Sequence, residues 1–278
     1  MTDMRPILVL LVLLFAFSCA KNSDSESADK EDRVFPDNAV KGVFSVSDTT
    51  EVCFAKGNVR FNARFNSWEY SEHQYDYIGV QNEHISVCNG NWIDLFGWGT
   101  GSKPWICSCE NTDYKDFYDW GQHFGDFGEW QTLSNDEWNY VLFGRQTASG
   151  VLFAKASVND TNGLMLFPDD WEKTLYAVDN QNDITSSYSS NKITSPIWDS
   201  VFQSHGVVFL PAAGSRNGKY VSMYKTKGFY WTSSGNKETE AFALSFSGSS
   251  VEMKPLDRFY GCSVRLSFFF NDSESRQR

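Results

Sequence analysis

The sequence predicts an α+β fold, built from many short antiparallel strands with two or three helices. Short segments rich in β-branched and aromatic residues recur along the chain, and Gly, Asn, Ser and Asp separate them, which is typical of strands joined by turns. Helix signals are few. Strands and helices do not alternate in the regular βαβ manner, which argues against a doubly wound parallel sheet.

The first predicted strands lie at residues 42–46, 51–55 and 59–65. In the third of these, apolar residues occupy every second position, so one face is expected to be buried. The alternating positions are Val59, Phe61, Ala63 and Phe65. Because residues 56–58 have turn composition, we expect 51–55 and 59–65 to pair as a hairpin.

Two helices are expected. Ser134 and Glu137 form the S-x-x-E capping box, in which each side chain satisfies an exposed backbone N–H, so a helix should run from there to about residue 143 or 145. A second helix is expected over residues 196–203, with Ser195 as N-cap and Pro196 in its first position. Gly206 should end it.

Further strands are expected in the last third of the chain, separated by turns at 233–237 and 247–250. The predicted strands are residues 207–210, 228–232, 241–246 and 263–270.

The N-terminus has the pattern of an export signal. Arg5 precedes an apolar run at residues 7–17, and about eleven residues are too few for a helix to cross the roughly 30 Å hydrocarbon core. Cys19 follows at the junction where bacterial lipoproteins are lipid-modified. We therefore expect residues 1–18 to be a lipoprotein signal peptide and Cys19 to be the lipid-attachment site that holds the protein in the outer membrane. The alternative is a plain secretory signal in which Cys19 is incidental.

Residues 19–34 are polar and predict a disordered acidic tether, because they offer too little apolar surface to offset the entropy of ordering. The early acidic residues Asp24 and Glu26 resemble the signal that sends Bacteroidetes lipoproteins to the outer face of the outer membrane. A solvated linker fits the same residues. Residues 35–270 are expected to form one domain, followed by a disordered tail at 271–278.

The net charge of −11 argues against a nucleic-acid partner, because phosphate binding needs a basic patch. Five cysteines follow Cys19, an odd number, so at least one is expected to be free or to pair outside the molecule, and the connectivity stays open. These are Cys53, Cys88, Cys107, Cys109 and Cys262. We expect no metal site, since a C-x-C spacing is too close for the usual zinc pair.

Several ordered motifs resemble the sulfatase-modifying-factor type of the C-type-lectin-like fold. The segment WQTLSNDEW at 130–138 resembles its W-x-x-L-[ST]-x-x-E-W signature. Further matches are LMLFPDDW at 164–171, FLPAAGSR at 209–216, FYWTSS at 229–234 and GCSVRL at 261–266. The segments DLFGWGT at 94–100 and YDWG at 118–121 are similar to a group of Bacteroidales lipoproteins related to the Fibrobacter major paralogous domain. The similarity covers roughly residues 44–268.

The resemblance implies a C-type-lectin-like domain but not an enzyme. Formylglycine-generating enzymes share this fold and use copper held by two active-site cysteines, whereas here Cys262 stands in the corresponding region without a second cysteine a few residues away. The four histidines form no metal-binding pattern and there is no G-x-S-x-G elbow. We therefore expect neither catalysis nor a cofactor.

A binding role has more support. Residues 110–130 mix carboxylates with aromatic rings, a combination that suits sugars or cationic peptide groups, although such a segment is more often loop packing. From this region we select Tyr118, Asp119 and Trp120 as candidate ligand-binding residues, together with Trp98 of the preceding motif at 94–100. The oxygen-rich stretch 179–183 suggests either Ca²⁺ binding or a solvated loop.

The motif residues also have packing interpretations. Trp130, Trp138, Trp171 and Trp231 are expected to be core anchors. Arg216 and Arg265 are expected to pair with buried carboxylates such as Asp169 or Asp170. Two function classes remain: a membrane-anchored module that binds a glycan or a protein, and a degenerate enzyme-like domain with a structural or accessory role in the envelope.

Overall fold

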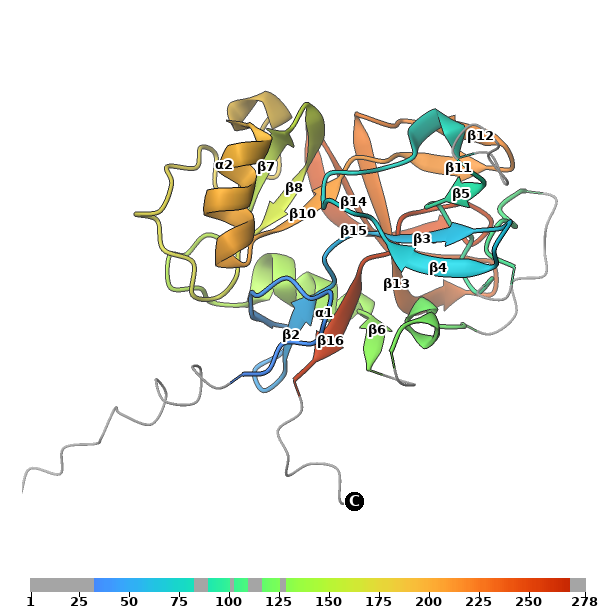
Figure 1. Cartoon of the computed structure of the whole chain (residues 1–278), viewed down its shortest axis with the longest axis horizontal. Coiled ribbons are helices and arrows are strands. Elements are labelled where there is room, and N and C mark those ends of the chain that lie inside the picture. Colours follow the sequence, from blue (N-terminus) through green and yellow to red (C-terminus); the bar gives the residue numbers. More distant parts are fainter. Residues whose placement is uncertain (1–32, 83–89, 101–102, 110–116, 126–128, 271–278) are drawn as a thin grey trace, which may run out of the picture. The chain divides into compact units, whose positions relative to one another are not determined.

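Antiparallel strands make up most of the regular structure, and two short α-helices accompany them, so the predicted α+β class is confirmed (Figure 1). The computed structural model describes residues 33–82, 90–100, 103–109, 117–125 and 129–270. The chain divides after Val34, and the unit that begins at Phe35 contains all of these elements. Cys19 and the expected signal peptide and tail lie outside the described residues.

The described strands form five small sheets. One has the order β1-β2-β16-β6, with the bounds Phe44–Ser45, Glu51–Phe54, Leu266–Phe269 and Trp130–Thr132. A second has the order β10-β8-β7-β9, with the bounds Val208–Pro211, Thr161–Leu166, Phe153–Val158 and Lys192–Ile193. A third has the order β13-β14-β15, with the bounds Lys227–Lys237, Glu240–Ser247 and Ser250–Asp257.

The two remaining sheets lie close to the site described below. One is β4-β3-β5, with the bounds Ser67–Tyr70, Val59–Asn62 and Trp92–Ile93. The other is the hairpin of β11 and β12, Ser215–Asn217 and Tyr220–Ser222. The short 3₁₀ turns are η1 at Gly79–Gln81, η2 at Trp120–His123, η4 at Tyr188–Ser190 and η6 at Gln203–His205.

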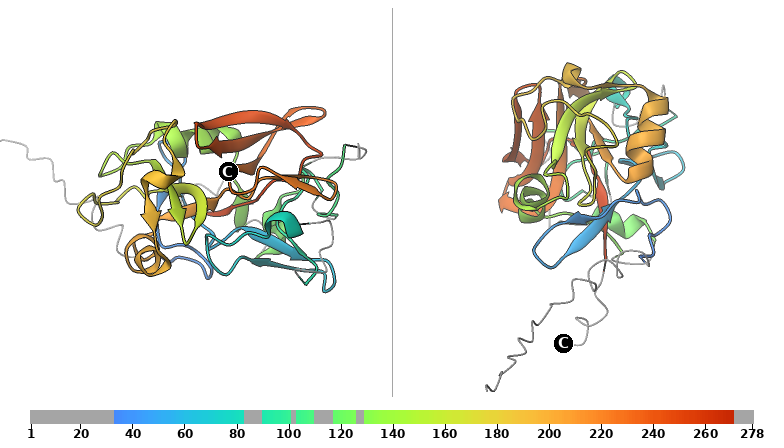
Figure 2. Two further views of the ribbon diagram at one scale, coloured as in Figure 1. Left: turned by 90° about the horizontal axis from the view of Figure 1, so that it is seen from above. Right: turned by 90° about the vertical axis from the view of Figure 1, so that its left-hand side faces the viewer.

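The sheet of β7 to β10 is buried on both faces. On one face, Ala156 and Met165 pack with Trp198 and Phe202, which follow helix α2 (Ser195–Ile197). Side chains of β7 and β8 on the other face share a core with Leu244 of β14 and with helix α1 (Asn135–Asn139). Both views of Figure 2 show this order of layers, with α2, the β7–β8 hairpin and the red strands β13 to β15 in succession. A third core lies beneath β3 and β4 and includes the rings of Trp98 and Trp120.

The capping box at Ser134 is confirmed. The Ser134 hydroxyl accepts from the Glu137 N–H, and the Glu137 carboxylate accepts from the Ser134 N–H. Helix α1 covers Asn135–Asn139 and continues as a single π-helical turn, η3, at Tyr140–Gly144. This turn is wider than an α-helical turn, because its hydrogen bonds join residues five apart, and the helical region ends near the expected residue.

The second helix differs at its start. Helix α2 covers Ser195–Ile197 and its N-cap is Thr194, whereas Ser195 had been expected in that role. Pro196 lies in the first turn, as expected. The π-helical turn η5 at Trp198–Phe202 and then η6 continue the helix, and Gly206 ends it with a φ of 79°.

The predicted hairpin of residues 51–55 and 59–65 is wrong. Strand β2 pairs with β1 and β16, whereas β3 pairs with β4 and β5. Asn58, between them, is buried, and its side chain accepts from Arg265 and donates to the Tyr230 hydroxyl. The connection is thus drawn into the core and does not form a surface turn. Phe65 is 69% exposed because the chain reverses at residues 63–66.

The predicted turn at 233–237 is also wrong, because β13 runs through it. After two bulges Gly235 pairs with Ala241 and Lys237 pairs with Glu240, so the strand extends to residue 237. The turn expected at 247–250 does separate β14 from β15, although β15 itself was not predicted.

The expected ion pairs of Arg216 and Arg265 are replaced by others. Asp169 binds Arg145, with a distance of 2.6 Å between Oδ1 and Nη1. Arg265 donates only to neutral oxygens, and Arg216 donates to backbone carbonyls. Asp170 is exposed. Sequence order alone does not bring an arginine and a carboxylate together, and here the β7–β8 sheet places Arg145 beside Asp169.

Candidate functional site

Of the four residues selected from the sequence, two are buried, one is half-buried and one is exposed. Trp98 is 3% exposed, its indole N–H donates to the Thr232 carbonyl at 2.8 Å, and the Arg258 guanidinium lies 4.3 Å from its ring centre. Trp120 is 0% exposed. A ligand could reach these two rings only if the core opened.

Asp119 acts as the N-cap of η2. Its carboxylate accepts from the Gly121 N–H and from both the N–H and the hydroxyl of Thr132. Burial raises the pKa of the Asp119 carboxyl, and these hydrogen bonds oppose the rise. Tyr118 is 38% exposed, so it is the member of the set with an accessible ring. Residues 110–116 and 126–128 of the same segment lie outside the described residues.

The four described cysteines that follow the expected lipid site are free thiols. Cys53, Cys107 and Cys262 are buried and Cys109 is exposed, while Cys88 lies outside the described residues. Burial raises the pKa of the Cys53 thiol to about 12 and that of Cys262 well above its ordinary value. These buried thiols are therefore protonated at neutral pH and are weak nucleophiles.

Side chains of the oxygen-rich loop at 179–183 accept hydrogen bonds from neighbouring parts of the protein. The Asn182 carbonyl oxygen accepts from the N–H groups of Leu152 and Phe153, and Asp183 accepts from Thr185. Within the described ranges, no group of three or more His, Cys, Asp or Glu side chains is placed to hold a metal ion.

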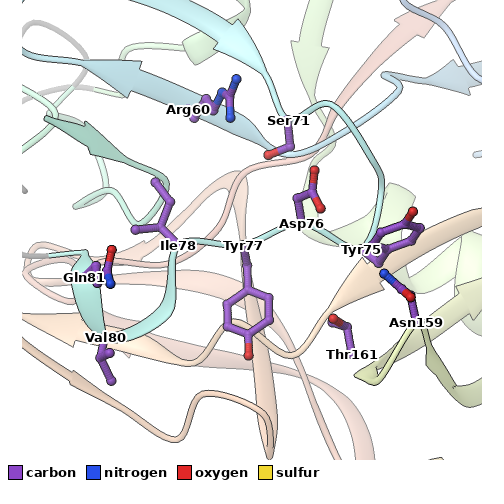
Figure 3. A pocket seen from close by; sticks show the side chains of 10 residues that line it. All are labelled: Arg60, Ser71, Tyr75, Asp76, Tyr77, Ile78, Val80, Gln81, Asn159 and Thr161. Carbon is purple, nitrogen blue, oxygen red and sulfur yellow. The ribbon is translucent and has the colours of Figure 1, made fainter. Parts of the chain in front are cut away.

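A cavity of about 490 Å³ opens beside η1, and we call it the Tyr77 pocket. Its aromatic lining is Tyr75 and Tyr77, and its hydrogen-bonding lining is Arg60, Ser71, Asp76, Gln81, Asn159 and Thr161. Figure 3 shows Tyr77 in the middle of this group, with Val80 and Gln81 on one side and Asn159 and Thr161 on the other. Cavities of this size with a few convergent polar groups are typical of small-ligand sites.

The segment that lines the Tyr77 pocket is anchored at both ends. Before it, Gln74 is buried, donates to the Val207 carbonyl and accepts from the Phe209 N–H at 2.8 Å. After it, the buried Asp94 accepts from the Ile78 N–H at 2.9 Å and from the Asn82 side chain. These contacts fix the backbone on either side of Tyr77.

Carboxylates lie near both tyrosines of the Tyr77 pocket, and Arg60 and Asp76 are the charged residues of its lining. Burial and then the carboxylates of Asp199, Asp76 and Glu72 raise the pKa of Tyr75. Burial, followed by Tyr224 and Asp94, raises the pKa of Tyr77. Both phenols therefore stay neutral and can donate a hydrogen bond to a ligand.

A second cavity of about 430 Å³ adjoins the first, and we call it the Trp68 pocket. Its lining consists of Asn38, Lys56, Arg60, Trp68, Glu69, Tyr70, Glu72 and Phe124. The rings of Tyr70 and Phe124 stack with their centres 4.2 Å apart. The Tyr70 hydroxyl is buried and has no hydrogen-bond partner among the described residues.

Neither pocket was found by sequence reasoning. The segment 71–82 places Tyr75, Asp76 and Tyr77 in succession, a local signal of the same aromatic and acidic kind as the one noted at 110–130. Arg60 and Asn159 had no such signal, because tertiary packing alone brings strand β3 and the β7–β8 turn to this place.

Comparison with known proteins gives one match. A family described as a domain of unknown function (DUF8237) matches residues 175–267, less than half of the chain. No curated protein and no solved structure matches. The matched region contains α2 and β13 to β15, and every residue that lines the Tyr77 pocket lies before it. In the described part of the chain, no helix has the length and apolar character needed to cross a membrane.

Proposed function

We propose that this protein is a non-enzymatic module that binds a neutral or amino-bearing glycan in the Tyr77 pocket. The observation that carries the proposal is the combination of two tyrosine rings with amide, hydroxyl and carboxylate groups around one cavity. Sugars present apolar C–H faces and many hydroxyls, so rings and mixed donors and acceptors suit them. The surrounding carboxylates favour a ligand that carries no negative charge.

Tyr77→Ala tests this proposal, with Tyr118→Ala as the matched control. Both tyrosines present ring surface, but Tyr118 does not line the pocket. We expect a neutral or amino glycan identified on an array to bind about tenfold more weakly to the Tyr77 variant, which corresponds to about 1.4 kcal/mol. The Tyr118 variant should bind like the unmodified protein. Loss of binding in the Tyr118 variant alone would place the site in the aromatic segment near η2 instead.

The non-enzymatic part of the proposal is supported by the state of Cys262. Its thiol is buried and its pKa is raised, whereas a reactive cysteine needs an accessible thiolate. Copper-dependent oxidation of a cysteine-containing peptide by the purified protein would contradict it. The ordered motifs and the α+β class support the finer proposal of a C-type-lectin-like domain of the sulfatase-modifying-factor type.

We also propose that Cys19 carries a lipid that holds the protein in the outer membrane, with Asp24 and Glu26 directing it to the cell surface. A Cys19→Ser variant should lose incorporation of labelled palmitate and leave the membrane fraction. Retention of both properties would overturn the anchor. Protease treatment of intact cells tests surface exposure, since a protein that stays protected does not face outward.

A structural or accessory role in the envelope is the second candidate. It is favoured by the burial of Trp98 and Trp120, which makes the motif aromatics part of the core. If no glycan binds and the Trp120→Ala variant fails to fold, this second candidate is the better account.

A further inference from the structure

The Tyr77 pocket and the Trp68 pocket share a wall. Arg60 lines both cavities. The segment after β4 also faces both, since Tyr70 and Glu72 line the Trp68 pocket and Ser71, between them, lines the Tyr77 pocket. Arg60 and the segment 70–72 therefore border both openings.

We propose that the two pockets are adjoining subsites for consecutive units of one glycan chain, which crosses Arg60. This inference rests on the proposed function and adds that the ligand is an oligosaccharide or polysaccharide. Each cavity has a volume within the range of a small-ligand site, and together they exceed what a single sugar needs.

The same chemistry occurs twice. The Trp68 pocket combines the half-buried rings of Trp68 and Phe124 with the polar groups of Asn38 and Lys56. The Tyr77 pocket combines tyrosine rings with amides and a hydroxyl. A repeated set of rings and hydrogen-bonding groups fits a polymer whose units repeat, and side chains supply these groups, which favours a glycan over a peptide that pairs through its backbone.

Arg60 is held firmly at the junction. Strand pairing places it opposite Glu69, with which it forms an ion pair, and its guanidinium lies 4.7 Å from the centre of the Trp92 ring. Its Nε is buried and has no hydrogen-bond partner among the described residues. An arginine fixed in this way is a rigid donor for an oxygen near the link between two sugar units. The carboxylates of Glu69, Glu72 and Asp76 disfavour sulfated and uronic acid chains.

The test is the dependence of affinity on chain length. The full chain is titrated with four series of oligomers, each from one to six units. The series are α-linked glucose, β-linked glucose, N-acetylglucosamine and glucosamine. We expect at least one series to bind more than tenfold tighter as tetramer than as monomer, because the longer chain fills both pockets.

Variants in the Trp68 pocket test the second subsite. Lys56 is exposed, so a change to Ala should leave the fold intact. We expect this variant to lose most of the gain with length while its affinity for the monomer stays unchanged. A control with Lys192 changed to Ala, which is exposed and outside either pocket, should keep the gain.

The outcomes separate the two proposals. Binding of monomer and tetramer with equal affinity would overturn the extended ligand and leave the Tyr77 pocket as a single-sugar site. An unchanged gain with length in the Lys56→Ala variant would likewise overturn the second subsite. If no series binds, both proposals fail, and binding of a lysine-rich peptide in place of every glycan would overturn the ligand class.

Discussion

Asp94 should make the protein more stable at mildly acidic pH than at neutral pH. Its carboxyl is buried, and burial raises its pKa from 3.8 to about 6, against the opposing effects of hydrogen bonds from Ile78 and Asn82 and of the charge of Arg216. The native state therefore holds this proton more tightly than the unfolded chain does. The resulting stability is fully present below pH 3.8 and is lost as the pH rises through 6.

The size of the effect follows from the two pKa values. A rise from 3.8 to about 6 corresponds to about 3 kcal/mol, at about 1.4 kcal/mol per pKa unit. Other groups also titrate in this range, so the relevant quantity is the difference between the unmodified protein and an Asp94→Asn variant. Relative to the Asp94→Asn variant, the unmodified protein should lose about 3 kcal/mol in its free energy of unfolding between pH 3.5 and pH 7.

Urea denaturation at half-unit steps of pH measures both proteins. The Asn side chain does not titrate, so its curve supplies the background from all other groups. Parallel curves for the two proteins would refute the reasoning, since they would mean that Asp94 has the same pKa in the folded and unfolded chains. A difference that grows in the opposite direction would refute it as well, because it would require a lowered pKa.

Three further predictions concern stability and are measured by the same denaturation. Ser134→Ala should lower the free energy of unfolding by about 1 kcal/mol because it removes the cap of α1, and Ser204→Ala, at an exposed hydroxyl, should lower it less. Equal losses in the two variants would contradict the capping role. Arg265→Lys should lower the free energy of unfolding by about 3 kcal/mol or more, because lysine cannot reproduce donation to four oxygens. A loss below about 1 kcal/mol would contradict the importance of these four hydrogen bonds. Gly206→Ala should destabilise the protein more than Gly150→Ala, although both glycines have positive φ, because a Cβ at Gly206 would lie 2.4 Å from the Gly42 Cα whereas one at Gly150 meets nothing within 4 Å. Equal losses of stability would show that φ alone matters.

Local chemistry was sufficient for the start of α1 and for the turn between β14 and β15. The capping box acts between residues three apart, so Ser134 and Glu137 predict it without knowledge of the fold. The hairpin expected around Asn58 shows the opposite case. Its residues do have turn composition and an alternating pattern. However, Asn58 accepts a hydrogen bond from the buried Arg265, and the two strands pair in different sheets.

The candidate site was predicted only in kind. Aromatic rings beside carboxylates occur both in the segment selected from the sequence and in the Tyr77 pocket, yet the selection included Trp120, which is 0% exposed, and missed Tyr77, which lines a cavity. The direction of a ring depends on which neighbours the folded chain supplies. The Tyr77 pocket needs β3, the segment through η1 and the β7–β8 turn in one place.

From the sequence alone follow the α+β class, the capped helix at Ser134 and the expectation of a lipid anchor at Cys19, because each depends on neighbouring residues or on composition. The tertiary structure alone decided that Arg145 and not Arg265 pairs with Asp169, that β2 joins β16, and that Arg60 stands between two cavities. These facts depend on contacts between residues far apart in the chain. Such contacts form where burial and hydrogen bonding are satisfied together, and a linear pattern does not carry that information.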